Sequence, residues 1–298
     1  MIFSSNNSFN PSFGQNSMLI KLIYANLAVF IGIKLLYLPF WLMQLSGSPN
    51  GWALQWLAVP SYLPNLLTRP WSMISYMFLH LDFWHILSNM LWLFFLGQLF
   101  VQFLGERKLW TLYISGGIAG AILYVLFFNV FPVFEDIRPV SKALGASASV
   151  MAVVIAIGTY MPNYSIRLLL LGEVKLKYIA LFSFILDVIS ISNSNSGGHI
   201  AHIGGAAMGF LFARQWQKGN DITEWAGKAS DFVVAIFHSR PKSKLKVKYS
   251  KTQHAKRKNE AARNDQAKVD AILDKISRSG YDSLSKEEKD TLFKASKQ

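Results

Sequence analysis

Long apolar stretches recur along the first 217 residues, and charged side chains are rare within them. A helix of about 17–25 apolar residues can cross the bilayer core, which is about 30 Å thick. Hydropathy predicts six such spans: Met18–Leu45, Phe83–Leu104, Leu109–Phe131, Gly145–Met161, Leu176–Ser192 and His199–Gln217. We therefore expect an all-α polytopic membrane protein built as a bundle of six transmembrane helices.

The connection Ser46–Leu79 is long yet apolar, and it is rich in tryptophan and leucine. Aromatic rings of this kind favour the boundary between membrane and water. Its prolines Pro60, Pro64 and Pro70 interrupt any long helix. The pattern predicts a loop in the outer interface and no seventh span; the alternative is a loop buried within the bundle.

Composition separates a membrane domain from a charged tail. The chain has 298 residues, 52% hydrophobic and 16% charged, with no cysteine. This composition excludes a mostly disordered chain and a disulfide-stapled secreted domain. From residue 214 to 298 there are 20 Lys and Arg and 11 Asp and Glu, against 10 and 6 in the preceding residues. The predicted parts are a short N-terminus (1–17), the six-span domain (18–217) and a basic tail (218–298).

Basic residues in the short connections predict the orientation, because Lys and Arg favour the cytoplasmic side. One set of connections contains Arg107, Lys108, Arg167, Lys175 and Lys177, and the basic tail lies on the same side. We expect a multi-pass protein of the inner (cytoplasmic) membrane with both termini in the cytoplasm. Residues 1–16 lack the pattern of a cleaved signal peptide, so the first span is expected to be retained.

Within the tail, Arg240–Lys258 is strongly basic and is expected to be disordered or to lie on anionic lipid. The spacing of apolar residues predicts a short amphipathic helix over Val269–Ser279, ended by Gly280. Ser285 and Glu288 predict a capping box that starts a second short helix. No nucleic-acid partner is expected, and the sequence contains no pattern that sets an oligomeric state.

Polar and ionisable side chains gather at one depth in three of the predicted spans. They are His85 and Asn89 in the second span, Ser147 and Ser149 in the fourth, and His199 and His202 in the sixth. Each group lies within about 10 Å of the outer end of its helix. A hydroxyl and an imidazole at one depth are typical of nucleophilic catalysis. Taken singly, each serine also fits a bond to its own helix, and each histidine a structural role.

Small residues spaced four apart predict which spans pack together. They are Ala148, Ala152 and Ala156 in the fourth span, Ala201, Gly205 and Gly209 in the sixth, and Gly116 and Gly120 in the third. Such faces let helix backbones approach closely. This packing would bring Ser147 and His202 within side-chain reach. A solute carrier is disfavoured, because the inner halves of the spans lack a matching polar path.

Three segments resemble the motifs of the rhomboid intramembrane serine proteases. His80–Asn89 is similar to the H-x4-H-x3-N element, Gly145–Ser147 to the G-x-S of the nucleophile, and Ala201–Gly209 to A-H-x-x-G-x-x-x-G. The resemblance covers roughly residues 18–217. The helical pair predicted in the tail is also similar to the C-terminus of some rhomboids of the Bacteroidetes.

The resemblance implies a Ser–His dyad without a third acid. Ser147 would be the nucleophile and His202 the general base. His85, Asn89 and the backbone N–H of Ser147 would form the oxyanion hole, and Gly145, Gly205 and Gly209 would allow close helix packing. The implied substrates are transmembrane segments of other membrane proteins in the lipid bilayer. No cofactor and no metal site are implied.

Some residues depart from the family pattern or compete with it. Ala148 follows Ser147 where glycine is usual, and Met151 stands where an aromatic residue is common. Ser149 is a rival nucleophile that points some 200° away from Ser147, and His199 is a rival base. Asp187 is a candidate third acid, expected near the outer end of the fifth span and in contact with water. The alternative function is a weak or inactive rhomboid-fold protein that binds transmembrane helices.

Overall fold

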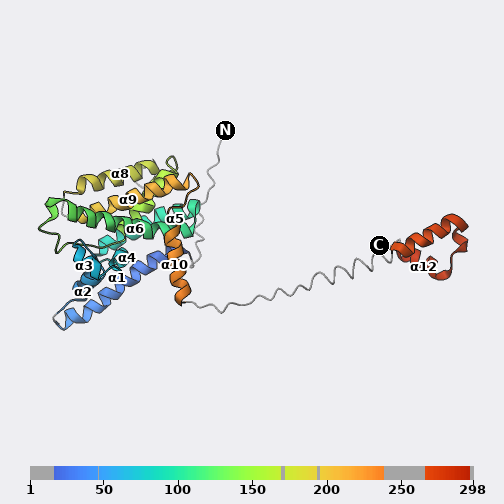
Figure 1. The fold of residues 1–298 in the computed structure, drawn as a ribbon, viewed down its shortest axis with the longest axis horizontal. Coiled ribbons are helices and arrows are strands. Elements are labelled where there is room, and N and C mark those ends of the chain that lie inside the picture. The colour runs from blue at the N-terminus through green and yellow to red at the C-terminus, as the bar shows by residue number, and fades with distance from the viewer. Residues whose placement is uncertain (1–16, 46, 169–171, 193–194, 238–265, 296–298) are drawn as a thin grey trace. The chain divides into compact units, whose positions relative to one another are not determined.

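The computed structural model describes residues 17–45, 47–168, 172–192, 195–237 and 266–295. The chain forms two compact units, Met1–His238 and Ser239–Gln298. Six long helices make up most of the first unit (Figure 1). They are α1 (Met18–Leu42), α5 (Phe83–Leu104), α6 (Glu106–Val130), α7 (Ser147–Tyr160), α8 (Leu176–Ser190) and α9 (Ser196–Trp216). The predicted all-α membrane bundle is confirmed.

The ends of the helices differ from the predicted spans by a few residues. The differences are largest at the end of α1 (Leu42 instead of Leu45), the start of α6 (Glu106 instead of Leu109) and the start of α9 (Ser196 instead of His199). The last of these has a clear local cause. The start of α9 is fixed by Asn195, whose side chain accepts a hydrogen bond from the Gly198 N–H at 3.3 Å. By length and composition α1, α5 and α6 are each able to cross a membrane.

Helix α7 is the short member of the bundle, with 14 residues. At 1.5 Å per residue it is about 21 Å long, less than the thickness of a bilayer core. At least one of its ends therefore lies below the membrane surface. Ser147 is its first residue.

From residue 47 onward, the described part of the long connection before α5 contains no further span, as predicted. Its elements are α2 (Pro49–Trp56), β1 (Val59–Pro60), α3 (Leu63–Thr68), α4 (Ser72–Ser75) and η1 (Tyr76–Phe78). Strand β1 pairs antiparallel with β2 (Lys142–Ala143), just before α7. Trp56 and Trp71 stack with ring centroids 6.4 Å apart. The loop is thus tied to the segment that leads into Ser147; its place at the membrane interface stays a prediction.

Helices α6, α7 and α9 approach one another through the small residues that the sequence indicates. A Cβ placed on Gly120 of α6 would lie 2.5 Å from the Cβ of Ala148 and 2.7 Å from the carbonyl oxygen of Ala201. A Cβ on Gly205 or Gly209 of α9 would overlap a carbonyl oxygen of α7. The predicted close packing of these spans is confirmed.

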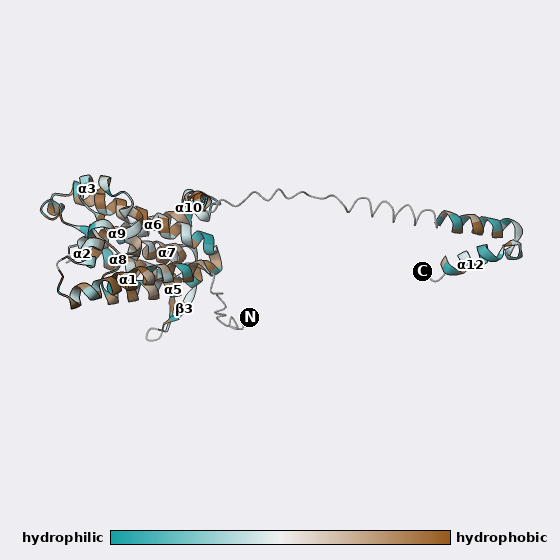
Figure 2. Cartoon of the chain, turned by 90° about the horizontal axis from the view of Figure 1, so that it is seen from below, coloured by the Kyte–Doolittle hydropathy of each residue, from teal (hydrophilic) through white to brown (hydrophobic). Residues whose placement is uncertain are grey.

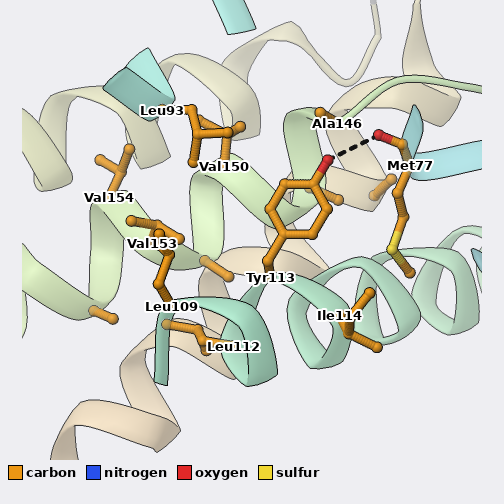
Figure 3. Packing of buried hydrophobic residues seen from close by; sticks show 14 of the residues in the cluster. Met77, Leu93, Leu109, Leu112, Tyr113, Ile114, Ala146, Val150, Val153 and Val154 are labelled. Carbon is orange, nitrogen blue, oxygen red and sulfur yellow. Dashed lines mark hydrogen bonds between the residues drawn. The ribbon is translucent and has the colours of Figure 1, made fainter. Parts of the chain in front are cut away.

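Large side chains fill the core between α5, α6 and α7 (Figure 3). Tyr113 of α6 is fully buried, and its hydroxyl donates to the Met77 carbonyl at 3.0 Å. It also accepts from the Asn26 amide of α1 at 3.2 Å. One buried phenol thereby links α6 to α1 and to the loop before α5, so its polar end is satisfied inside the bundle.

The long helices are largely apolar, as the hydropathy colours show (Figure 2). Exposed aliphatic and aromatic side chains lie along α1 and α8, among them Leu35, Leu36, Phe182 and Ile189. In water such a surface would be strongly unfavourable, whereas acyl chains cover it at no cost. The distribution is that of a bundle surrounded by lipid.

At the end of the bundle where α6 begins, a further helix, α10 (Glu224–Phe237), lies across the axes of the long helices (Figure 1). Lys108 of α6 forms an ion pair with Asp221, and Trp110 Nε1 donates to Ser230 Oγ at 2.7 Å. Partial burial raises the pKa of Asp221, but the bonds from Lys108 and Thr223 outweigh burial and hold it below its usual range. The sequence pattern predicts only two helices after residue 217, and α10 is a further helix in this region.

Within the same unit, β3 (Ser165–Leu168) and β4 (Gly172–Lys175) form an antiparallel hairpin between α7 and α8. It occupies the connection that separates the predicted fourth and fifth spans. Its charged residues Arg167, Glu173 and Lys175 lie outside the apolar helices.

In the second unit, a helix over residues 266–279 is followed by η3 (Tyr281–Ser283) and α12 (Lys286–Ala295). Gly280 ends the first helix with φ of 78°. The capping box is present: the Ser285 N–H donates to Glu288 Oε2 at 2.7 Å, and the Glu288 N–H donates to Ser285 Oγ at 3.3 Å. Both predicted tail helices are confirmed, whereas Arg240–Lys258 lies outside the described residues.

The contact between α7 and α9 leads to a stability prediction. We expect Gly209→Ala to lower stability by about 1–3 kcal/mol, because the added methyl overlaps the Ala152 carbonyl and forces the helices apart. The matched control is Gly32→Ala in α1, where an added Cβ meets nothing within 4 Å. Thermal unfolding in detergent measures both; equal midpoints for the two variants would contradict the prediction.

Candidate active site

A sharp turn places Ser147 at the N-terminus of α7. Gly145 has φ of 114°, a backbone conformation that glycine adopts without strain. Its N–H donates to the Tyr76 carbonyl at 2.9 Å, which holds the turn against the loop before α5. A Cβ at Gly145 would lie 2.6 Å from Cε1 of His85. Glycine is therefore needed both for the turn and for the close approach of the imidazole.

No side chain caps the N-terminus of α7. The first backbone N–H groups of a helix have no partner within the helix, and the helix dipole makes this end positive. Ser147 is half-buried at this end. Its own N–H belongs to this set of free donors, which suits an oxygen that develops negative charge.

His85 and Asn89 share one face of α5, as the sequence predicts. The Asn89 amide donates to the His85 carbonyl at 2.8 Å, and Asn89 is 5% exposed. Asp82 caps the helix by accepting from the His85 N–H at 2.9 Å. These bonds fix the first turn of α5, so that the His85 ring lies beside Gly145 at the entrance to α7.

His80 packs against the same turn before α7. It is fully buried, and its Nε2 accepts from the Ala146 N–H at 3.2 Å. Its ring meets that of His85 edge-on, with centroids 5.0 Å apart. Burial, and then the neighbouring His85, lower the pKa of His80 to about 4. A neutral His80 thus accepts a bond from the residue that precedes Ser147.

His202 lies on α9 with its Nδ1 2.8 Å from Oδ1 of Asp187. His199 Nδ1 contacts the same oxygen, also at 2.8 Å. Asp187 is only 6% exposed, so the expectation that it lies in water was wrong. Asp187 lies near the end of α8, a position that favours contact with water. In the fold, two imidazoles of α9 hydrogen-bond to its carboxylate instead.

The helix junction described above brings together the chain segments that contain Ser147 and His202. Each is next in sequence to a residue that Gly120 contacts, Ala148 in the first case and Ala201 in the second. Both are half-buried. Among the described residues none hydrogen-bonds to the Ser147 hydroxyl. Catalytic bonds are often long without substrate, and the imidazole Nε2 is the nitrogen that Asp187 leaves available.

The rival nucleophile lies elsewhere. Ser149 is 1% exposed, and a Cβ on Gly117 of α6 would lie 2.6 Å from its Oγ. Its hydroxyl faces the interior between α6 and α7, where it has no hydrogen-bond partner in the described structure. Met151 packs toward Ala180 and Ala206. Ser149 is therefore enclosed between two helices, whereas Ser147 is half-buried at the start of α7.

Sequence reasoning missed Lys34 of α1. Its Nζ donates to the Leu81 carbonyl at 2.7 Å, in the turn between His80 and His85. The ammonium also lies 5.5 Å from the centroid of the Phe30 ring. Helix α1 has 25 residues and contains Lys21 near its start and Lys34 well inside the apolar stretch. The position of Lys34 was the available sign, because charge within a span is costly and usually has a role.

Asp187, His199 and His202 are the only group in the described ranges whose donor atoms are close enough to share a cation, all within 4.8 Å. Each nitrogen lies 2.8 Å from the same oxygen, which is the length of an N–H···O hydrogen bond. We therefore assign both imidazoles as hydrogen-bonded to the carboxylate of Asp187.

Comparison with known protein families decides the membership of the chain. The Rhomboid domain matches residues 67–216, which is half of the sequence. The chain belongs to the rhomboid family. The matched segment of this rhomboid contains His85, Asn89, Ser147, Asp187 and His202, whereas Lys34 precedes it. A family of unknown function (DUF6576) matches residues 255–298.

Several curated rhomboids are similar over the same region. Rhomboid protease GlpG of Yersinia pseudotuberculosis is 29% identical over 160 residues, covering 54% of this chain and 52% of that protein. RHOMBOID-like protein 12, mitochondrial, of Arabidopsis thaliana is 28% identical over 158 residues, covering 50% and 47%. Rhomboid protein 1, mitochondrial, of Saccharomyces cerevisiae is 28% identical over 151 residues, covering 50% and 42%. This rhomboid spans about half the length of these relatives.

The buried His80 leads to a pH prediction. Its pKa is about 4 in the folded protein, whereas the ordinary value is 6.5. Between these pH values the unfolded chain binds a proton at His80 and the folded protein does not. Its contribution is complete above pH 6.5 and is lost as the pH falls toward 4. We expect the unfolding temperature to fall more steeply over this range in wild type than in His80→Asn, which accepts the Ala146 N–H without titrating. Parallel pH curves would contradict this assignment.

Proposed function

We propose that this rhomboid is an intramembrane serine endopeptidase that cleaves transmembrane segments of other membrane proteins. The observation that supports the proposal is the junction of α6, α7 and α9, where Ala148 and Ala201, the sequence neighbours of Ser147 and His202, both lie against Gly120, and where Ser147 begins a helix with no side-chain cap. A nucleophile, a base and free backbone donors at one level meet the requirements of acyl transfer. Membership of the rhomboid family and the similarity to Rhomboid protease GlpG support the same reaction class.

In the proposed acylation step, Ser147 Oγ attacks the carbonyl carbon of the scissile peptide bond. Nε2 of His202 takes the hydroxyl proton, and the carbonyl oxygen becomes an oxyanion. The tetrahedral intermediate then collapses: the C–N bond breaks, and the proton on Nε2 passes to the leaving amine. The products are an acyl ester on Ser147 and a new amino terminus.

The oxyanion is stabilised by fixed donors in a site of low dielectric constant. The proposed donors are the Ser147 N–H, the ring of His85 and the amide of Asn89. The His85 ring is held by the Gly145 turn and by His80, and α5 is fixed by its Asp82 cap. The Asn89 amide now donates to the His85 carbonyl, and its second N–H is the one available to substrate.

Deacylation reverses the same chemistry with water. Nε2 of His202 takes a proton from the water, whose oxygen attacks the ester carbonyl. When the intermediate collapses, the proton returns to Ser147 Oγ and the carboxyl product leaves. Water must therefore reach a site below the membrane surface, which is consistent with a short α7 and half-buried Ser147 and His202.

The substrate class follows from the surroundings of the site. A helix hides its peptide groups in internal hydrogen bonds, so a transmembrane substrate must unwind near the bond to be cut. Residues that weaken helices should favour cleavage. We further propose an inner-membrane location with both termini in the cytoplasm and the site open to the opposite side, because the basic connections and the basic tail share one side.

A second candidate is a rhomboid-fold protein that binds transmembrane helices without cutting them. The observation in its favour is that the Ser147 hydroxyl makes no hydrogen bond to His202 in the described structure, while Met151 lies toward Ala180 and Ala206. Both candidates use the same bundle surface. They differ only in whether Ser147 reacts.

Labelling by a fluorophosphonate probe tests the proposal. The purified protein in liposomes is treated with the probe beside Ser147→Ala, Ser149→Ala and His202→Ala. We expect a labelled wild type and Ser149→Ala, and no labelling of the other two variants, because only Ser147 has a base beside it. Thermal unfolding of each variant checks that the bundle is intact.

The same experiment can reject the proposal. If the folded wild type stays unlabelled under conditions that label a control rhomboid protease, the binding protein becomes the preferred function. Labelling that persists in Ser147→Ala would assign the reaction to another residue.

A further inference from the structure

The carboxylate of Asp187 lies behind the proposed catalytic base and is shared by two imidazoles. It comes from α8, whereas both histidines come from the first turns of α9. His199 and His202 each place Nδ1 2.8 Å from the single oxygen Oδ1. Their rings are nearly perpendicular, with an interplanar angle of 79° and centroids 5.9 Å apart. One buried oxygen thus fixes the orientation of two rings.

Hydrogen-bond chemistry decides the tautomer that this arrangement favours. An ionised carboxylate only accepts hydrogen bonds, so each Nδ1 that faces it must carry the proton. In a neutral imidazole the other nitrogen, Nε2, is then the acceptor and the base. For His202 this leaves Nε2 unprotonated, as the acylation step requires. If the proton lay on Nε2, the ring could not accept the Ser147 proton in this orientation.

We propose that Asp187 is a positioning residue that holds His202 in the Nδ1-protonated form and stabilises the imidazolium formed during acylation, with His199 holding the carboxylate in place. The inference rests on the proposed function and replaces the expected two-residue dyad by a chain from Ser147 through His202 to Asp187. During attack the Ser147 proton moves to Nε2 of His202. The Nδ1 proton stays on His202, and Asp187 stays ionised throughout.

The charged and titratable groups around His202 are few. Asp187 faces it from α8, His199 lies one turn away on α9, His85 approaches from α5, and Ser147 lies at the start of α7. Of these groups only Asp187 is negative. It is therefore the group that can offset a positive charge on His202 inside a site of low dielectric constant.

His199 has a different part in the same arrangement. A carboxylate 6% exposed loses most of its water, and one hydrogen bond would leave it poorly compensated. The second imidazole supplies another N–H at the same distance. Removing His199 should loosen Asp187 without removing its charge, whereas removing the charge of Asp187 should affect His202 directly.

The rate of fluorophosphonate labelling as a function of pH tests the inference. In Asp187→Asn we expect the maximal rate to fall by about 10²–10⁴-fold, with little change in the probe concentration that gives half-maximal rate. The acid limb of the profile should move to lower pH, because the imidazolium loses its negative partner. Asp187→Glu should recover part of the rate, and His199→Gln should lose less than about 10-fold.

The matched control is Asp231→Asn. Asp231 is an exposed carboxylate that pairs with Arg107 at 2.6 Å, at the other end of α6. We expect wild-type labelling and a wild-type pH profile from this variant. A uniform effect of both Asp variants would indicate a change of overall charge and would overturn the positioning role.

A second measurement follows the tautomer without any reaction. Histidine labelled with ¹⁵N is incorporated, and the protein is examined in liposomes by solid-state NMR. In wild type the His202 spectrum should show Nδ1 protonated and Nε2 free, and Asp187→Asn should increase the Nε2-protonated form. Comparison with His202→Gln assigns the resonances.

The outcomes separate this inference from the proposed function. If wild type is not labelled at all, the proposed function fails first. If wild type is labelled and folded Asp187→Asn keeps its rate, its pH profile and the tautomer of His202, the positioning role is overturned while the endopeptidase stands. If Asp187→Asn does not fold, the tautomer in wild type still decides: a His202 with Nε2 protonated overturns the inference.

Discussion

The close approach of three helix backbones is the constraint on which the site depends. At Gly120 of α6 there is room for the Ala148 methyl and the Ala201 carbonyl only because glycine has no side chain. Lipid offers no hydrophobic gain for pressing helices together, so small residues and the dispersion contacts they permit must do it. Ser147 directly precedes Ala148, and His202 directly follows Ala201, so the packing at Gly120 brings their chain segments together. The proposed chemistry therefore depends on helix packing.

The polar groups of the site are costly in such surroundings, and the fold satisfies most of them locally. His80 accepts from Ala146, Asn89 donates to His85, and Asp187 takes two imidazoles. Each bond holds a residue next to the reacting atoms. In the described structure, His80 Nδ1 and the Ser147 hydroxyl have no such partner. In the proposed reaction the fixed groups around Ser147 would act as a preorganised site.

Helix length adds a second constraint on function. The 14 residues of α7 are too few for a full bilayer crossing, so at least one of its ends lies below the membrane surface, and Ser147 is its first residue. A hydrolase in a membrane needs water where its substrate is apolar. Helix α7 is short, and it begins beside the Gly145 turn, the β1–β2 pair and the proline-rich loop. The longer helices α5 and α6 are able to cross the membrane and hold the bundle in it.

The sequence by itself determined the six helices, their small-residue faces, the tail helices with their Ser285–Glu288 cap, and the residues now found around Ser147. These are local properties: hydropathy, spacing and capping depend on neighbours in the chain. The tertiary structure alone decided that Asp187 is buried against His199 and His202, that Lys34 reaches Leu81, and that α10 packs on α6. Those contacts join residues from different helices or loops. Whether the Asp187 carboxylate of α8 contacts water depends on the side chains that α9 packs against it.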